Sequence, residues 1–125
     1  MALAFVGDGV YELLVREYVL AQGNASAHTL HMKAVQFVKA AAQSEAVEAV
    51  LPHLSEEEIA IYKRGRNAHS TTIPKNANPA QYRKATGLEA LFGYLHLENR
   101  TERVRELFQI VVDSIYTKEE SALGR

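Results

Sequence analysis

Apolar residues recur along the chain at intervals of three and four, which is the spacing of one face of an α-helix. No stretch of useful length alternates apolar and polar residues as a β-strand would. The sequence therefore predicts an all-α protein. Its 125 residues are the usual size of one folded unit, so we expect a single domain spanning residues 1–125.

The first predicted helix covers about residues 2–21. Its apolar positions share one face, and Gly23-Asn24 is a typical helix end. Ser26 is a candidate N-cap for a second helix, which we expect to run on as far as Pro52. The chain opens inside the first helix without a capping residue, so the sequence leaves open whether residues precede Met1.

Capping residues also mark the later helices. Ser55 with Glu58 has the pattern of a capping box, and the helix that it begins is expected to end near Gly65. Residues 66–78 are polar and are predicted as a loop. Asn78-Pro79 then combines an N-cap with proline at the first helical position.

That helix is expected to reach about Leu97. Thr101 is expected to cap a last helix, with apolar positions as far as Ile115. Residues 119–125 are expected to be frayed.

The absence of cysteine narrows the chemistry. It excludes disulfides, thiolate catalysis and cysteine-ligated zinc, and it agrees with a reducing cytoplasm. No apolar run approaches the roughly 18 residues that cross a bilayer, and the N-terminus lacks the features of a signal peptide. We therefore expect a cytoplasmic protein with no membrane partner.

Several enzyme classes find no support in the sequence. A serine–histidine hydrolase needs a nucleophile elbow, and phosphate- and dinucleotide-binding enzymes need glycine-rich loops; neither pattern is present. Among the five histidines, His28 and His31 have i,i+3 spacing, but no second pair matches them. We interpret the histidines as surface residues.

The formal net charge of −1 conceals an uneven distribution of charge. Residues 59–88 contain no Asp or Glu, yet they include six of the 14 basic residues. Cations neutralise phosphates, and short polar side chains hydrogen-bond the RNA backbone, so this stretch is a candidate RNA-binding surface. The alternative is an ordinary solvated loop. The residues expected to contact RNA are Lys63, Arg64, Arg66, Asn67, His69, Lys75 and Arg83.

Asp8 is an acidic residue in an otherwise apolar helix. It lies between Gly7 and Gly9, each of which costs about 1 kcal/mol of helix stability relative to alanine. We interpret the glycines as allowing another backbone or a bulky ligand to come close. The alternative is a tightly packed helix with Asp8 at its margin. Glu12 follows one turn later and projects from nearly the same face.

Glu89 is the second such acid, in the segment Leu88-Glu89-Ala90-Leu91-Phe92-Gly93. A lone carboxylate in a largely buried helix must be paired, bound to a metal or turned to the edge, since burying it alone is expensive. The alternative to a metal ligand is a salt bridge to a residue such as Arg16.

Two segments resemble the catalytic motifs of the ribonuclease III family. Leu3-Ala4-Phe5-Val6-Gly7-Asp8 is similar to the family's signature helix, Leu-Glu-Phe-Leu-Gly-Asp, and residues 88–93 are similar to its second catalytic helix, Val-Glu-Ala-Leu-Ile-Gly. Two carboxylates of the family pattern are replaced, by Ala4 and Thr86. The Mini-ribonuclease III branch shows both replacements and also resembles this chain at Arg66-Asn67-Ala68-His69-Ser70, Pro74-Lys75-Asn76 and Tyr82-Arg83.

The resemblance implies a function. A member of this branch would be a homodimeric endoribonuclease that cleaves double-stranded RNA, with the precursor of 23S ribosomal RNA as its substrate. It would dimerise through the signature helix, with Phe5 inserted into a pocket of the other subunit. It would have no separate double-stranded-RNA-binding domain, and a ribosomal protein is a candidate further partner.

The resemblance also implies a mechanism. Asp8 and Glu89 are the implied catalytic residues and the ligands of Mg²⁺, for which Mn²⁺ can substitute, and Glu12 is a candidate third ligand. Mg²⁺ prefers oxygen ligands and would activate water for in-line attack on phosphorus, leaving 5′-phosphate and 3′-hydroxyl ends. With few protein carboxylates, metal binding is expected to be weak until RNA supplies a phosphate oxygen. Thr86 and Tyr82 share the face of Glu89 and are expected to line the same cleft.

Two other classes of protein remain open. A dimer that kept the ribonuclease III fold but lost activity with the two missing carboxylates would bind RNA or the ribosome without cutting. A helical protein–protein adaptor would have an indifferent charge distribution, against which the acid-free basic stretch argues. Asp8 and Glu89 favour the nuclease, because a binding module has little reason to keep acids in apolar surroundings.

Overall fold

The computed structural model describes residues 1–68 and 73–123, and within them it contains six α-helices, one 3₁₀ turn and no strand. The all-α prediction is confirmed. In the same described part of the chain, no helix combines the length and apolarity that a membrane span requires. The elements are α1 (Ala2–Gln22), α2 (Ala27–Val38), α3 (Ala40–Val50), η1 (Leu51–His53), α4 (Glu56–Asn67), α5 (Pro79–Leu97) and α6 (Thr101–Leu123).

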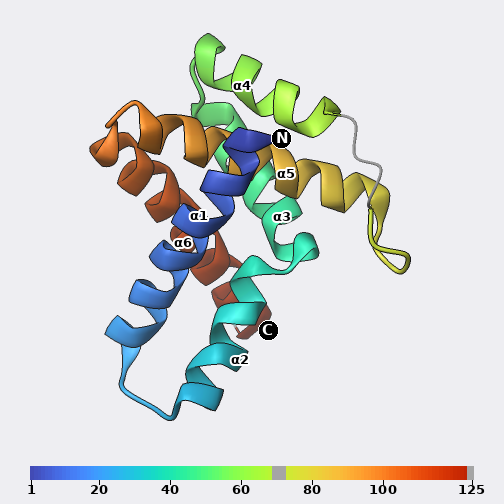
Figure 1. Ribbon diagram of the computed structural model, residues 1–125. Helices are drawn as coiled ribbons and strands as arrows, with labels where there is room; N and C mark the ends of the chain where they lie inside the picture. Colours follow the sequence, from blue (N-terminus) through green and yellow to red (C-terminus); the bar gives the residue numbers. More distant parts are fainter. Residues whose placement is uncertain (69–72, 124–125) are drawn as a thin grey trace.

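Helix α5 runs through the middle of the molecule, and α1, α3, α4 and α6 all pack against it (Figure 1). Leu88, Leu91 and Leu95 recur on α5 at intervals of three and four and are completely buried. Tyr11 of α1 packs edge-to-face on Phe92, with ring centroids 5.2 Å apart. The core therefore lies between α5 and the helices around it.

Most predicted helix ends agree with the structure. α1 ends at Gly23, whose φ of 154° suits glycine. The side chains of Ser26, Ser55 and Asn78 cap α2, α4 and α5, and Ser55 forms the predicted capping box with Glu58. These ends were predictable because each depends on a cap residue beside the helix in sequence.

The predicted second helix is wrong, because it is two helices joined by a bend. Lys39 has an extended ψ of 150°, so α2 ends at Val38 and α3 begins at Ala40. The side-chain amide of Gln43 donates to the Val38 carbonyl oxygen at 2.9 Å. It thereby satisfies a carbonyl at the end of α2, where helical partners run out.

Two other helix boundaries differ from the prediction. α4 continues to Asn67, so Arg66 and Asn67 lie on its last turn and not in a loop. Basic residues favour this extension because cations stabilise the negative end of the helix dipole. Thr101 is the first residue of α6 instead of its cap. The helix is assigned as far as Leu123, and the expected fraying of residues 119–125 stays a prediction.

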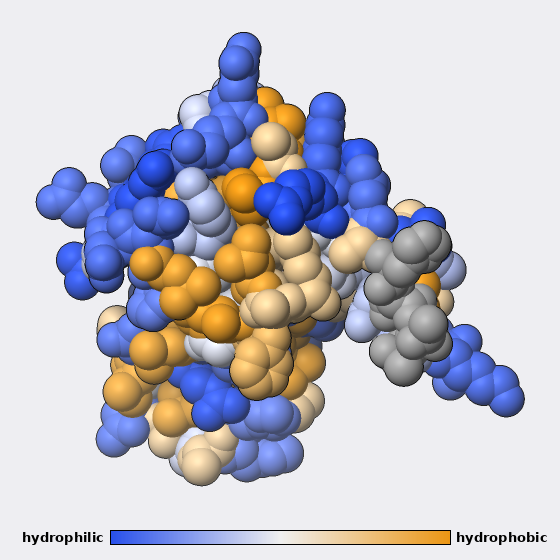
Figure 2. All heavy atoms as spheres, turned by 45° about the horizontal axis from the view of Figure 1, so that its top comes forward, coloured by the Kyte–Doolittle hydropathy of each residue, from blue (hydrophilic) through white to orange (hydrophobic). Residues whose placement is uncertain are grey.

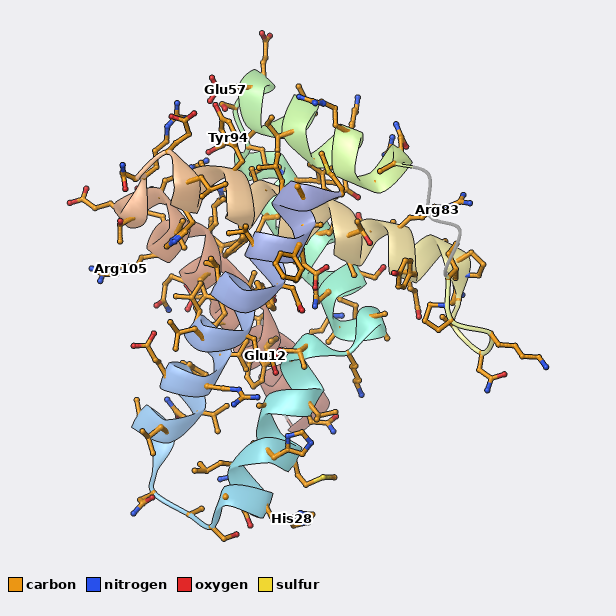
Figure 3. All side chains as sticks on the ribbon, viewed as in Figure 1. Glu12, His28, Glu57, Arg83, Tyr94 and Arg105 are labelled. Carbon is orange, nitrogen blue, oxygen red and sulfur yellow. The ribbon has the colours of Figure 1, made fainter. Side chains whose placement is uncertain are left out.

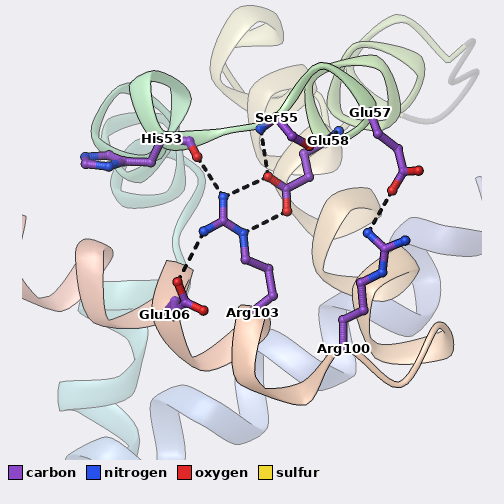
Figure 4. Close-up of polar contacts among 7 residues, drawn as sticks. All are labelled: His53, Ser55, Glu57, Glu58, Arg100, Arg103 and Glu106. Atoms are coloured by element: carbon purple, nitrogen blue, oxygen red, sulfur yellow. Dashed lines mark hydrogen bonds and ion pairs between the residues drawn. The ribbon is translucent and has the colours of Figure 1, made fainter.

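A network of ion pairs joins the start of α4 to α6 (Figure 4). The side chain of Glu58 is only 4% exposed and accepts two hydrogen bonds from Arg103, each 2.8 Å long. Arg103 also donates to the His53 carbonyl at 2.7 Å, and Arg100 pairs with Glu57 beside it. Hydrogen bonding to Arg103 holds the pKa of Glu58 below its ordinary value. The network holds the start of α4 against α6, and the other end of α4 carries predicted RNA-binding residues.

Candidate active site

Helices α1 and α5 cross at two glycines, with no side chain between their backbones. A Cβ atom on Gly7 would lie 1.6 Å from the Glu89 carbonyl oxygen, and one on Gly93 would lie 2.0 Å from the Leu3 carbonyl oxygen. No other residue type fits at such distances, so only glycine permits this approach. The prediction that a glycine beside Asp8 admits another backbone is therefore confirmed for Gly7.

Gly9 does not take part in this crossing. A Cβ atom there would meet no described atom within 4 Å of the same chain, so the expectation that a ligand or another backbone comes close at Gly9 stays a prediction. Gly9 lies instead on the outer face of α1, four residues from both Phe5 and Leu13.

The crossing places the two predicted catalytic acids together. Burial raises the pKa of Glu89 to about 8, helped by the negative charge of Asp8 and by a side-chain hydrogen bond to Asp8. Two carboxyl groups at hydrogen-bonding distance cannot both ionise freely; they share a proton or a cation. This arrangement is suited to holding a divalent cation.

Two polar side chains that the sequence analysis missed also interact with Glu89. Gln43 is 3% exposed, and its Nε2 lies 3.4 Å from Glu89 Oε2. Tyr11 is 1% exposed, and burial, followed by the charge of Glu89, raises its pKa. Among the described residues, the Tyr11 hydroxyl and Gln43 Oε1 are buried without a hydrogen-bond partner. The only sequence signal for Gln43 is an amide in an alanine-rich helix.

Glu12 is not grouped with the other two acids. It accepts a hydrogen bond from Arg16 at 3.2 Å, and it affects the pKa of Glu89 less than Asp8 does. Arg16 thus pairs with Glu12 and not with Glu89, contrary to the alternative considered for Glu89. Within residues 1–68 and 73–123, no group of three or more His, Cys, Asp or Glu side chains could hold a metal ion.

Ala4 and Thr86 stand where the family pattern has carboxylates. Ala4 is 7% exposed, and the Thr86 hydroxyl donates to the Tyr82 carbonyl at 3.0 Å, within α5. Tyr82 and Thr86 are both half-buried. Neither Ala4 nor Thr86 brings a negative charge, so the acidic part of the site is formed by Asp8 and Glu89.

A second pair of glycines joins α4 to the same stretch of α5. A Cβ atom on Gly65 would lie 2.5 Å from Ala90 Cβ, and one on Gly87 would lie 2.7 Å from Tyr62 Cε1. Gly87 and Ala90 flank Glu89 in sequence. The basic end of α4 is therefore held against the part of α5 that carries the catalytic candidate.

The predicted RNA-binding residues are mostly exposed to solvent. Arg83 points outward from the first half of α5, on the side where α4 ends (Figure 3). Arg66 stacks over the Tyr62 ring, 5.7 Å from its centroid, and Lys84 pairs with Glu48 at 2.8 Å. His69 lies outside the described residues. The exposed members of the predicted set are Lys63, Arg64, Asn67, Lys75 and Arg83.

Helix α1 also carries an exposed apolar strip. Phe5 is 84% exposed, and Leu13 and Leu20 are more than half exposed. Apolar side chains gather over the middle of one face of the molecule in Figure 2. A patch of this kind is typical of a contact surface.

Comparison with known proteins gives consistent matches. Residues 1–100 match the family model described as Ribonuclease III domain. The chain is 44% identical over 114 residues to Mini-ribonuclease 3 of Clostridium tetani, covering 90% of this chain and 76% of that protein. It is 44% identical over 117 residues to Mini-ribonuclease 3 of Enterococcus faecalis, covering 92% and 89%. The crystal structure of protein FN1578 from Fusobacterium nucleatum superposes with a TM-score of 0.80 and 33% identity, covering 90% and 89% of the two chains.

Proposed function

The chain belongs to the Mini-ribonuclease III branch of the ribonuclease III family and is an endoribonuclease of double-stranded RNA, and from this premise we propose that it cleaves with Mg²⁺ held by Asp8 and Glu89. One observation carries the proposal. The Gly7–Gly93 crossing brings Asp8 to Glu89, and the Glu89 carboxyl has a pKa of about 8. A divalent cation would replace the proton that two such acids otherwise share.

The donor set fits a hard divalent cation. Both groups are carboxylates, which Mg²⁺ and Mn²⁺ accept as ligands, so Mn²⁺ can substitute. The ion supplies neutralisation of charge at the phosphodiester and activation of water. Since no third acid joins these two among the described residues, oxygen atoms of the RNA would complete the site, and cation binding would be weak without RNA. Glu12 remains a candidate for orienting a bound water, because it stays one turn from Asp8.

The basic end of α4 would position the substrate. Lys63, Arg64 and Arg66 lie on the last turns of α4, which Gly65 and Gly87 hold against the stretch of α5 around Glu89. Cations that neutralise phosphates release counterions and bind a duplex without reading its sequence. The same role is proposed for Asn67, His69, Lys75 and Arg83.

We propose that the active form is a homodimer joined through α1. Phe5 and Leu13 form an exposed apolar strip, and Gly9 between them leaves room for a second helix to approach closely. A dimer would place two sites on one substrate. By resemblance to the branch, the proposed natural substrate is the precursor of 23S ribosomal RNA in the cytoplasm, with a ribosomal protein as a candidate further partner.

RNA binding without cleavage is the second candidate function. One observation favours it: the described residues contain no group of three or more potential metal ligands. The two functions differ in one respect. The nuclease would cleave RNA with a cation held by two acids and the substrate, whereas the binding protein would not cleave.

The experiment that tests the proposal is incubation of the purified protein with a double-stranded RNA in Mg²⁺ or in EDTA. A single-stranded RNA of the same sequence is the control. We expect cleavage of the duplex in Mg²⁺ only, with 5′-phosphate and 3′-hydroxyl ends. Binding of the duplex without cleavage at any Mg²⁺ concentration would favour the non-catalytic function.

A further inference from the structure

Gln43 is a buried amide that packing alone does not explain. It is 3% exposed, lies in the alanine-rich helix α3 and contacts two acceptors on different segments. Its Nε2 atom is 2.9 Å from the Val38 carbonyl oxygen and 3.4 Å from Glu89 Oε2. The side chain therefore links the bend between α2 and α3 to a carboxylate of the proposed metal site.

The chemistry of its neighbours fixes how this amide is oriented. An amide nitrogen has two hydrogens to donate, and both nearby groups are acceptors. The reverse orientation would place Oε1 against the Val38 carbonyl and the Glu89 carboxylate, which repel it. In the orientation that remains, Oε1 is buried without a partner in the described part of the chain.

An unpaired buried oxygen destabilises a fold. A leucine or methionine would fill the same space among the buried side chains of α3, such as Ala46 and Val47, without burying that oxygen. Residues that conflict locally with the fold are expected where function requires them. The contact of Gln43 with Glu89 gives such a functional reason for the buried amide.

We propose that Gln43 is a positioning residue, which donates to Glu89 Oε2 and so holds this carboxylate in place beside Asp8 for the cation. The inference rests on the proposed function, in which Glu89 is a metal ligand. A contact of 3.4 Å is long for a hydrogen bond, and contacts of this kind commonly shorten once the charged partner is engaged. Groups that support a metal ligand in this way commonly change metal affinity or activity by 10–100-fold when they are removed.

The test compares Gln43→Met with wild type in four measurements on the whole chain. Methionine keeps the length and apolar volume of the side chain but donates no hydrogen bond. Mn²⁺ binding without RNA, which the proposed function expects to be weak, is measured at high protein concentration by the electron paramagnetic resonance signal of the free ion. The other three are the Mg²⁺ concentration for half-maximal cleavage, the melting temperature in EDTA and the binding of duplex RNA in EDTA. We expect Mn²⁺ to bind at least about tenfold more weakly and the Mg²⁺ requirement to rise, with RNA binding in EDTA unchanged.

A matched control separates positioning from stability, because Gln43 also supports the bend through Val38. Ala46→Gly destabilises the same helix without contacting Glu89, so it should lower the melting temperature and leave Mn²⁺ binding intact. The positioning role is refuted if Gln43→Met lowers only the melting temperature, or if Ala46→Gly weakens Mn²⁺ binding equally. If Gln43→Met does not fold, Gln43→Asn carries the same test, since its shorter amide cannot reach both acceptors.

Glu89→Gln distinguishes failure of this inference from failure of the proposed function. If Glu89→Gln loses Mn²⁺ binding while Gln43→Met keeps it, the positioning role alone is wrong. If Glu89→Gln binds Mn²⁺ like wild type, the metal assignment is wrong and the positioning role is wrong with it.

Discussion

The Gly7–Gly93 crossing predicts that one methyl group on α1 disrupts both the fold and the site. In Gly7→Ala the new Cβ would lie 1.6 Å from the Glu89 carbonyl oxygen, 2.5 Å from its carbonyl carbon and 2.9 Å from the Gly93 nitrogen. All three are backbone atoms of the buried helix α5, so no side chain can rotate away. The two helices would have to separate by more than an ångström.

The size of the effect follows from that collision. Overpacking a core lowers the free energy of unfolding by about 1–3 kcal/mol. Because the backbone of α5 cannot move aside as a side chain could, we expect Gly7→Ala to lie at the upper end, about 3 kcal/mol. For a chain of this size, the melting temperature would fall by about 10 °C. The same separation moves Asp8 away from Glu89, so the cleavage rate per folded molecule should fall while RNA binding persists.

Gly9→Ala is the matched control, since it makes the same change two residues later on the same helix. Its Cβ meets open space, so the gain in helix propensity should raise stability by up to about 1 kcal/mol. Melting followed by circular dichroism at several protein concentrations separates this gain from any effect on the dimer. A Gly7→Ala protein that melts and cleaves like wild type would refute the tight crossing.

Three further predictions concern stability, assembly and RNA binding. Arg103→Met leaves Glu58 buried and unpaired, which should cost about 3 kcal/mol at neutral pH. Because pairing lowers the folded-state pKa of Glu58, that stabilisation exists above the unfolded value of about 4.3 and is lost as the pH falls through the folded pKa. In chemical denaturation the difference between Arg103→Met and wild type should therefore shrink below about pH 4, and a difference independent of pH would contradict the assignment. Phe5→Ala should weaken the dimer in sedimentation, and a wild type that is monomeric at micromolar concentration would exclude the proposed dimer. The triple variant Arg64→Gln, Arg66→Gln and Lys75→Gln should bind RNA more weakly, and its salt dependence should flatten by roughly one unit of slope for each lost phosphate contact. An unchanged slope would show that these three cations are ordinary solvent-exposed residues.

Most of the fold could be predicted because its signals are local in sequence. Ser55 and Glu58 specify the start of α4 by themselves, and Asn78-Pro79 does the same for α5. The bend at Lys39 could not be predicted in this way. It depends on Gln43 reaching back to a carbonyl at the end of α2, and neither proline nor glycine marks it.

The candidate site was predictable in part for a related reason. Asp8 and Glu89 are conspicuous as acids among apolar residues, and that contrast is visible in the sequence alone. Which glycine permits their approach is not visible, since Gly7 and Gly9 look alike and only Gly7 faces α5. Gln43 was missed because its importance depends on Glu89, 46 residues away in sequence.

The most direct measurement of the central claim is the cleavage rate per folded molecule of Asp8→Asn and Glu89→Gln, taken with duplex RNA binding and melting. We predict that each change abolishes cleavage by orders of magnitude and leaves binding and folding intact. In EDTA, Glu89→Gln should even melt above wild type. A raised folded-state pKa means that ionised Glu89 weakens the fold as the pH rises from the unfolded value of about 4.3 to about 8. Variants that melt lower but cleave at nearly the wild-type rate would contradict the claim that these acids hold the catalytic metal.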